Sequence, residues 1–458
     1  MAITSGSTSY FLIAKQTARG IRAPWNTFSN KIYQFNGGGI GLTGDFTNTP
    51  TNKGNFGPTA TKLGQVGGEG SVQIPQDTIG MGLWIEALMS TSIAPSDSVR
   101  ILATPVEMRA AATFVSGTPI TTFITDTQPK DHLPGVTDSA PGVNAAPINL
   151  SFASTVRADT GATIVIEGFD QGEQRPLEET IPVTDAAAIT DKTTENAFAE
   201  VTSITLNDFT TVGNVTVNYT SNLYKHTFNV GNALTNGLTV EMVKGTEPNT
   251  YQDVHVSEAT WTMGDVNEFD MTLIGGRAYL GMNAENNGPA PSSDTGKARP
   301  DSESAAGWGT VFRLNDQRID IGEASVTVNH SLGATENPTG RHVYRRPPVQ
   351  TANREITLST RVDYPVDDID GNRIDVAALA WGQDVSASIE AAAMDFGAEP
   401  NLVTIDLPNG KLSSFPDPAD ISQGQINQPL EVAGYAKGAT TDFRITLINK
   451  ETHAQLIS

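Results

Sequence analysis

The side chains in this sequence most able to do chemistry are its six histidines. None of them follows the His-x-His or His-x-x-x-His spacing that brings two imidazoles onto one metal ion. His255 and His330 fall in stretches that we expect to be strands, where a packed or hydrogen-bonded histidine is the ordinary case. Cysteine is absent, which excludes disulfides, thiolate metal sites and cysteine nucleophiles. We therefore predict no metal site and no cofactor.

Two short runs resemble ligand-binding loops but lack essential parts of them. The glycine-rich run 36–41 (Asn-Gly-Gly-Gly-Ile-Gly) has no Gly-Lys-Ser/Thr after it, so it does not match a phosphate-binding loop. The run 367–371 (Asp-Asp-Ile-Asp-Gly) would place Val366 and Ala377 where a calcium loop needs its first and last carboxylates. We interpret the first run as a flexible loop or hairpin tip and the second as a capped turn before a helix.

Nothing in the sequence assembles a catalytic group. The chain has no Gly-x-Ser-x-Gly nucleophile motif, and we expect no enzyme. The one basic cluster is the run 341–348 (Arg-His-Val-Tyr-Arg-Arg-Pro-Pro). We interpret it as an exposed loop that pairs with acidic neighbours; a contact between subunits, or with DNA in transit, is the alternative.

Length and charge set limits on the function. The 458 residues suffice for two to three domains. The 51 acidic residues outnumber the 29 Lys and Arg, giving a net charge of -22, which argues against tight binding to nucleic-acid phosphates. No stretch reaches ~18 consecutive apolar residues, so we expect no membrane span. The N-terminus lacks a basic segment before an apolar run, so we expect no signal peptide.

The elements expected from this sequence are mostly strands. The 43 glycines and 26 prolines disfavour helix interiors and favour strands joined by turns. Alternating apolar positions predict half-buried antiparallel strands at 148–156, 324–328 and 443–447. The alternation changes phase at 322–323, which predicts a β-bulge. Helical spacing is convincing only at 78–89 and 372–381.

An internal repeat is the most informative feature of the sequence. Segment 263–274 aligns without gaps to 437–448, and both contain a turn glycine followed by Phe-x-(Met/Ile)-Thr-Leu-Ile. Each copy follows a strand and a helix that carries a tryptophan, Trp84 or Trp381. A tandem duplication explains this order better than a chance match of strand residues.

The spacing within the repeat predicts an insertion in the first copy. Trp84 lies 185 positions before Phe269 and Trp381 lies 62 positions before Phe443, a difference of 123. Short strands separated by turns fill the region of that size, as in a small β-sandwich. We therefore predict a discontinuous first domain at 1–98 and 223–282, an insertion at 99–222, a linker at 283–307, and a second domain at 308–458.

Several of these segments carry a resemblance to a known family. They are the strand and helix of 70–89, the strand 238–245 with the hairpin up to Gly276, and the strand start 319–329. With these, residues 10–100 and 223–458 resemble the major tail (tail tube) proteins of long, non-contractile-tailed bacteriophages. The insertion resembles the immunoglobulin-like decorations of such proteins, for example at 198–206.

The resemblance implies a mainly β fold: two tandem tail-tube-type β-sandwich or half-barrel domains, each with one flanking helix, plus an inserted immunoglobulin-like β-sandwich. Members of the family close rings of six tube domains and stack them, so a chain with two domains would form a homotrimeric ring, favoured over a hexamer. The implied partners are further copies, the tape-measure protein, neck and tail-tip proteins, and DNA passing without specific binding during ejection. The implied location is the virion tail, assembled in the host cytoplasm without a membrane.

The loops that precede the strand–helix unit in each copy, 37–68 and 333–350, exceed ordinary hairpin loops, so we expect them to reach the adjacent ring. We expect the acid excess to line the lumen, where it repels phosphate within a Debye length of ~8–10 Å; solubility of the outer surface is the alternative. The candidate subunit or ring–ring contacts are Asp45, Phe46, Phe56, Arg341, Tyr344, Arg345 and Arg346.

Two other functions remain open from the sequence. A tail-tip or fibre-type adhesin with β-sandwich domains would need aromatic-rich exposed loops, and aromatic residues are only 7% of the chain. A β-sandwich glycosidase would need clustered Trp and Tyr beside a carboxylate pair, and the 5 tryptophans are scattered.

Overall fold

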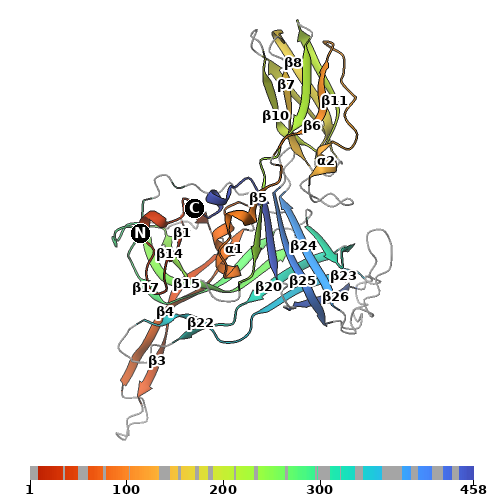
Figure 1. Ribbon diagram of the computed structural model, residues 1–458. Coiled ribbons are helices and arrows are strands. Elements are labelled where there is room, and N and C mark those ends of the chain that lie inside the picture. The colour runs from red at the N-terminus through yellow and green to blue at the C-terminus, as the bar shows by residue number, and fades with distance from the viewer. Residues whose placement is uncertain are drawn as a thin grey trace.

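The protein is mainly β and antiparallel, as the sequence predicts (Figure 1). The computed structural model describes residues 9–34, 37–49, 60–75, 79–102, 104–133, 145–152, 156–170, 175–183, 189–210, 213–231, 236–263, 267–293, 297, 310–319, 321–335, 344–363, 384–393, 401–414, 427–435 and 443–457.

The elements fall into three groups along the chain. The first half contains β1 (Tyr10–Lys15), β2 (Tyr33–Gln34), β3 (Gly37–Thr49), β4 (Ala60–Pro75), α1 (Gly82–Met89), β5 (Ser98–Arg100), β13 (Tyr224–Asn229), β14 (Leu238–Lys244), β15 (Glu247–Met263), β16 (Glu268–Gly275) and β17 (Arg277–Tyr279), with short 3-10 turns at Trp25–Thr27 and Pro95–Asp97. The insertion contains β6 (Val106–Thr113), α2 (Pro129–His132), β7 (Ala146–Phe152), β8 (Ala158–Phe169), β9 (Pro176–Val183), β10 (Asp191–Phe198), β11 (Glu200–Phe209) and β12 (Asn214–Tyr219). The second half contains β18 (Thr310–Leu314), β19 (Gln317–Ile319), β20 (Ile321–Asn329), β21 (Leu332–Thr335), β22 (Arg346–Gln350), β23 (Glu355–Asp363), β24 (Val385–Ala393), β25 (Asn401–Ser414), β26 (Asn427–Gly434), β27 (Arg444–Asn449) and α4 (His453–Leu456).

The first expected helix is present but shorter than its pattern. Helix α1 begins at Gly82 rather than near residue 78, and Ser90 ends it in the left-handed region at φ 49°. Gly80 also has a positive φ, 83°, which a helix cannot accommodate, so the helix starts after it. Trp84 on α1 packs edge-on against Phe11 and Tyr33 with ring centroids 6.1 and 5.9 Å apart. The second expected helix, 372–381, lies outside the described residues.

The glycine-rich run is a strand, so its interpretation as a loop or hairpin tip was wrong. Residues 37–41 begin β3, which pairs with β4 over its whole length. Here the glycines allow the backbones of β3 and β4 to approach closely, because a Cβ on Gly38, at φ 84°, would overlap the carbonyl oxygen of Ser71.

The bulge predicted at 322–323 is confirmed by a register shift between Ile321 and Ala324 in the β20–β23 pair.

The two halves repeat one order of strand pairing. In the first half the order is β1-β14-β15-β16-β4-β3. In the second half it is β18-β24-β25-β26-β23-β20. The strands also follow one another along the chain in the same sequence in both sets, so each strand of one half has a counterpart in the other.

Matching irregularities fix this correspondence residue by residue. The register of β14 on β15 shifts between Leu238 and Val240, and that of β24 on β25 shifts in the same way between Val385 and Ala387. A second shift follows Val256 in β15 and Leu412 in β25. Because bulges bend strands at fixed points, these shifts place Ser414 of β25 at the position of Glu258 in β15.

The strand pairing corrects the sequence alignment of 263–274 with 437–448. The counterpart of β16 is β26, because β16 pairs with β4, β26 pairs with β23, and β4 and β23 are themselves counterparts. Strand β27 instead takes the place of β17, since each pairs with the N-terminal part of β25 or β15. The sequences match because both strands serve one core: Phe269 and Phe443 both contact Trp261, at centroid distances of 4.4 and 6.4 Å.

The sheets of the two halves are continuous within the chain. Residues 258–263 of β15 pair with 324–329 of β20, which joins the edges of corresponding sheets. On the other side of the core, β27 pairs with β13, which in turn pairs with β5. One hydrophobic cluster therefore includes side chains of both halves, among them Trp84, Trp261 and Phe443.

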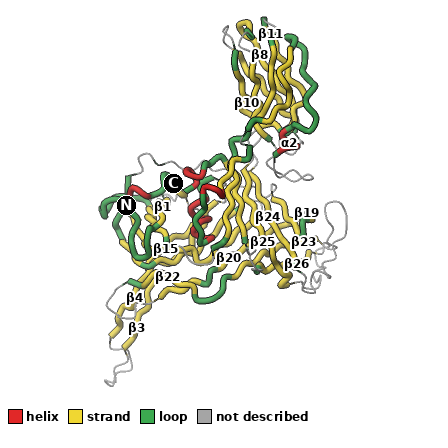
Figure 2. The backbone as a smooth tube through the Cα atoms, viewed as in Figure 1, coloured by secondary structure: helices red, strands yellow, loops and turns green. Residues whose placement is uncertain are grey.

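The insertion is a separate two-sheet sandwich that projects from the body (Figures 1 and 2). Its sheets have the orders β10-β7-β12-β6 and β11-β8-β9, and its own core includes Phe114, Phe152 and Phe209. The order differs from the constant-type immunoglobulin arrangement, in which the last strand joins the sheet of the third and sixth strands. Here the last strand, β12, lies between β6 and β7.

The beginning of the predicted linker is docked on the first half. The buried carboxylate of Glu241 accepts hydrogen bonds from the backbone N–H of Ala284 at 2.7 Å and of Ser292 at 3.0 Å. The Ser292 hydroxyl donates a third at 2.6 Å. Because an unpaired buried carboxylate is costly, these donors fix residues 284–292 against β14.

Candidate functional surface

The sheet shared by the two halves has one apolar and one polar face. Along β16, residues 269, 271 and 273 are buried, whereas 268, 270 and 272 are not. The same alternation runs through β15, β20 and β23, where Trp261, Val326 and Leu358 point into the core. Antiparallel sheets commonly have one solvated face, so the outward residues form a surface, here called the polar sheet face.

Carboxylates dominate the charge of the polar sheet face. Among the described outward residues of β15, β16, β20, β23 and β26, the cation is Arg361 of β23. Its carboxylates come from β15, β16, β20, β23 and β26, and they are Glu258, Glu268, Asp270, Glu323, Glu355 and Glu431. The face therefore carries net negative charge.

Side chains on this face bond across strands. The Thr260 and Thr327 hydroxyls lie 3.1 Å apart across the β15–β20 junction. At the end of that junction, the Asn329 amide donates to Glu258 at 2.9 Å. Between β4 and β16, the Gln73 amide donates to Glu268 at 2.7 Å. Such cross-strand pairs each contribute roughly 0.2–1 kcal/mol, so the face is polar but ordered.

A shallow hollow of about 470 Å³ lies on the polar sheet face. At its rim, Arg361 Nε and Glu323 Oε1 are 3.2 Å apart with side chains 66% and 61% exposed. An ion pair this exposed stabilises little. The lining comes from β15, β20, β23 and β26 and combines hydroxyl and methylene groups with Glu323, Arg361 and Glu431, so the hollow is part of the sheet face.

The edge of β3 differs from that of its counterpart β20. Strand β20 is paired on both sides, with β23 and β15. In the described part of the chain β3 pairs with β4 alone. At Ile40 side chains occupy the open edge, because the Tyr251 hydroxyl donates to the Ile40 carbonyl at 2.8 Å and Met242 Sδ accepts from its N–H at 3.4 Å. Beyond Ile40, residues 42–49 have no further strand partner among the described residues.

The predicted contact residues fall in two places. Asp45 and Phe46 lie in β3, which forms with β4 a two-stranded arm (Figure 2). Tyr344 makes a parallel bridge with Val66 of β4. Arg346 is exposed at the start of β22. Phe56 and Arg341 lie outside the described residues.

Tyr344 and Arg345 contact the first half of their own chain. The Arg345 guanidinium pairs with Glu69, and the backbone N–H of Arg345 donates to the Val66 carbonyl at 3.0 Å. The Arg277 guanidinium lies 5.2 Å from the Tyr344 ring centroid. Arg345 thus pairs with an acidic neighbour, as the sequence predicts for the basic run, but its side chain is only 11% exposed rather than part of an exposed loop.

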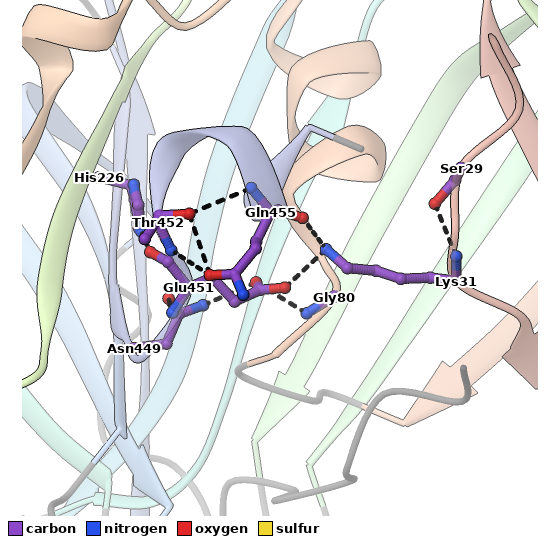
Figure 3. A network of polar contacts seen from close by, with 8 residues as sticks. All are labelled: Ser29, Lys31, Gly80, His226, Asn449, Glu451, Thr452 and Gln455. Carbon is purple, nitrogen blue, oxygen red and sulfur yellow. Dashed lines mark hydrogen bonds and ion pairs between the residues drawn. The ribbon is translucent and has the colours of Figure 1, made fainter. Parts of the chain in front are cut away.

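A buried polar network ties the C-terminus to the first half (Figure 3). Glu451 accepts from Lys31 Nζ at 2.6 Å, and from the Gly80 N–H and the Asn449 amide at 3.0 Å each. The backbone carbonyl of Glu451 lies 2.9 Å from His226 Nε2. Because a buried charge must be paired and hydrogen-bonded, this network holds the last strand and α4 in place.

Ser98 lies between two imidazoles in this network, 2.9 Å from His226 Nδ1 and 3.1 Å from His453 Nδ1. A serine beside a histidine is the geometry of an activated nucleophile. Here the second nitrogen of His226 bonds to a backbone carbonyl rather than to a carboxylate. The contacts all serve to join β5, β13 and the C-terminal segment, which supports a structural role.

The burial of His226 predicts an acid-sensitive fold. Burial lowers the pKa of His226, opposed by its hydrogen bond to the Glu451 carbonyl and by the Glu451 charge. The unfolded chain then binds the proton more readily, so stability is lost as pH falls through the unfolded value of about 6.5. We expect the free energy of unfolding to drop between pH 7.5 and 5.5, by up to about 1.4 kcal/mol per pH unit from this group.

The matched variant is His226→Gln, whose amide can donate to the Glu451 carbonyl and accept from Ser98 but cannot titrate. Urea unfolding at both pH values should show a weaker pH dependence for His226→Gln than for the parent, whereas His453→Gln should keep most of it. Equal pH dependence in the parent and His226→Gln would show that His226 is not the titrating group.

Comparison with protein-family models and with curated proteins finds no match. In the described part of the chain, no cluster of His, Asp and Glu has the geometry of a metal site. No described helix is long and apolar enough to cross a membrane.

Sequence reasoning missed the polar sheet face, although the pattern that forms it was visible. Alternation in 268–274 separates Glu268, Asp270 and Thr272 from the buried residues between them. The sequence could not show that five such strands lie side by side, because alternation reports which side of a strand is buried and not which strand is its neighbour.

Proposed function

We propose that this chain is the structural subunit of a phage tail tube, whose sheets join from copy to copy around a DNA-conducting lumen. The observation that supports it most is the β15–β20 junction, which joins corresponding sheets of two equivalent halves inside one chain. The edge of β3 that corresponds to the joined edge of β20 has no strand partner within the described chain. Such an edge is a liability in a free subunit and an assembly surface in a ring.

Repeating the in-chain junction between chains would generate a ring. The contact is heterologous, because the β25 end of one copy meets the β3 edge of the next, and heterologous contacts close into rings when the rotation permits. Two equivalent halves per chain mean that three copies supply six sheets. We therefore propose a trimer with pseudo-sixfold symmetry, in preference to a hexamer of chains.

In this ring the polar sheet face would line the lumen. Its carboxylates repel a phosphate backbone within ~8–10 Å at physiological salt, and hydroxyl-rich strands present few groups that bind DNA tightly. The insertion would lie away from the lumen, because it leaves the body beside β5 and α1 (Figure 1), and α1 packs on the apolar side of the sheet, opposite the polar sheet face. Tape-measure, neck and tail-tip proteins remain the proposed further partners, and the virion tail the proposed location.

Electron microscopy of the purified protein tests the proposal. We expect rings or stacked tubes with threefold or pseudo-sixfold symmetry, with the projecting insertions on the outside. The expected lumen wall is the polar sheet face, identifiable in averaged images. Monomers at all concentrations, or rings with the polar sheet face outward, would contradict the proposal. They would favour the adhesin alternative instead.

A further inference from the structure

The edge of β17 is the second place where the two halves differ. Its counterpart β27 is paired on both sides, with β25 and with β13. In the described part of the chain, β17 pairs with β15 alone. The first half thus covers the outer edge of the second half, whereas no described strand pairs with the corresponding edge of the first.

The side chains around β17 have the composition of an interface. Ile21, Leu280 and Met282 are 56%, 49% and 42% exposed, among the few large apolar side chains so exposed. Exposed apolar residues beside Tyr, Met and Arg are typical of protein contacts. The set is here called the β17 patch and comprises Ile21, Arg22, Arg277, Tyr279, Leu280 and Met282.

Two arginines give the β17 patch positive charge. The guanidinium groups of Arg22 and Arg277 lie 5.4 and 4.6 Å from the centroid of the Tyr279 ring. Arg22 also donates to the Asn287 side chain at 2.6 Å, and neither arginine is in an ion pair with a described residue. Guanidinium groups held on an aromatic ring remain able to bind carboxylates.

We propose that the β17 patch docks the second half of another copy of this chain, through the acidic segment 364–384. In the first half, the stretch between β4 and β14 contains α1 and β13, and β13 covers the edge of β27. The corresponding stretch of the second half, between β23 and β24, is 364–384. If copies repeat the in-chain arrangement, this stretch of one copy meets β17 of the next.

The charges on the two sides are complementary. Segment 364–384 contains Asp367, Asp368, Asp370, Asp375 and Asp384 against the single cation Arg373. The chain has a net charge of -22, so a surface that presents two arginines attracts its acidic segments. Complementary charge selects the partner and the register of docking. The inference rests on the proposed ring, in which the β3 edge and the β17 patch of one first half face the same neighbour.

A charge-swap cycle tests the docking. Sedimentation velocity would compare the parent with Arg22→Glu/Arg277→Glu, with Asp367→Arg/Asp368→Arg, and with the four changes combined. We expect each double variant to self-associate at least about tenfold more weakly in 0.15 M salt, and the combination to return to within about threefold of the parent. Lys192→Glu/Lys225→Glu, which alters net charge equally elsewhere on the surface, should associate like the parent.

The outcomes separate this inference from the proposed function. If the parent forms rings and Arg22→Glu/Arg277→Glu associates equally well, the docking is refuted while the tube proposal stands. If both double variants are weakened but the combination is not restored, the two segments do not meet and the docking is again refuted. If the parent does not associate at any concentration, both proposals fall.

Discussion

A cysteine pair at Thr43 and Ser414 should crosslink neighbouring copies into a covalent ring. The position follows from the in-chain junction, where Glu258 of β15 lies opposite Asn329 of β20. Ser414 is the counterpart of Glu258. Gly39 of β3 pairs with Ser71 of β4, and Ser325 of β20 pairs with Ser359 of β23. Because Ser71 and Ser359 are counterparts, Gly39 and Ser325 are counterparts too. Four residues further along the two strands, Thr43 is therefore the counterpart of Asn329.

The geometry favours a clean disulfide. Directly opposite residues of antiparallel strands have Cα atoms about 4.5–5.5 Å apart, within the range a disulfide spans. The chain has no native cysteine to interfere. On a non-reducing gel, oxidised Thr43→Cys/Ser414→Cys protein should show dimer and trimer, with trimer as the largest species. Crosslinking that continues to six chains would favour a hexamer.

The controls come from the same sheet. Glu258→Cys/Asn329→Cys should form its disulfide within one chain and run as a monomer. Gly41→Cys/Ser414→Cys, shifted by two residues or roughly 7 Å, should crosslink poorly. If the in-chain pair oxidises fully and Thr43→Cys/Ser414→Cys stays monomeric, the β25–β3 contact is excluded.

Replacing Trp261 should strongly destabilise the body of the protein. Trp261 is 1% exposed, stacks on Phe269 and contacts Phe443, and pairs with Val326 of β20. It thus packs both halves into one core. Truncating a buried tryptophan costs about 3–5 kcal/mol through lost burial and the cavity that remains, so Trp261→Ala should lower the free energy of unfolding by that amount.

Urea unfolding followed by circular dichroism would measure the effect. The insertion has its own core, so its transition should stay unchanged while that of the body moves. Trp25→Ala is the matched control: Trp25 lies on a short 3-10 turn, partly exposed, with Lys297 Nζ 4.6 Å from its ring. We expect it to cost about 1 kcal/mol. If Trp261→Ala lowers the free energy of unfolding by less than Trp25→Ala does, Trp261 does not hold the two halves together.

Local pattern determined the secondary structure well. Alternation located β7, β20 and β27, because successive side chains of a strand point to opposite faces. It identified the buried sides of β7 and β20, but the prediction of a half-buried strand at 443–447 was wrong, since Thr446 and Ile448 are buried as well as Ile445 and Leu447. The phase change before Ala324 marked a real bulge. The glycine-rich run was misread because glycine lowers strand propensity, whereas here the close backbone approach to β4 favours glycine.

Which strands pair with one another could be decided only from the tertiary structure. The sequence alone determined a duplicated, acidic, mainly β chain with an insertion, but it matched 263–274 to 437–448 by the packing that both share. Only the folded chain decided that β16 corresponds to β26, that β15 joins β20, and that the β3 edge and the β17 patch are left without a described strand partner. The physical reason is that burial of one face produces alternating apolar residues within each strand separately. The neighbouring strand in a sheet is instead selected by contacts between residues far apart in the chain.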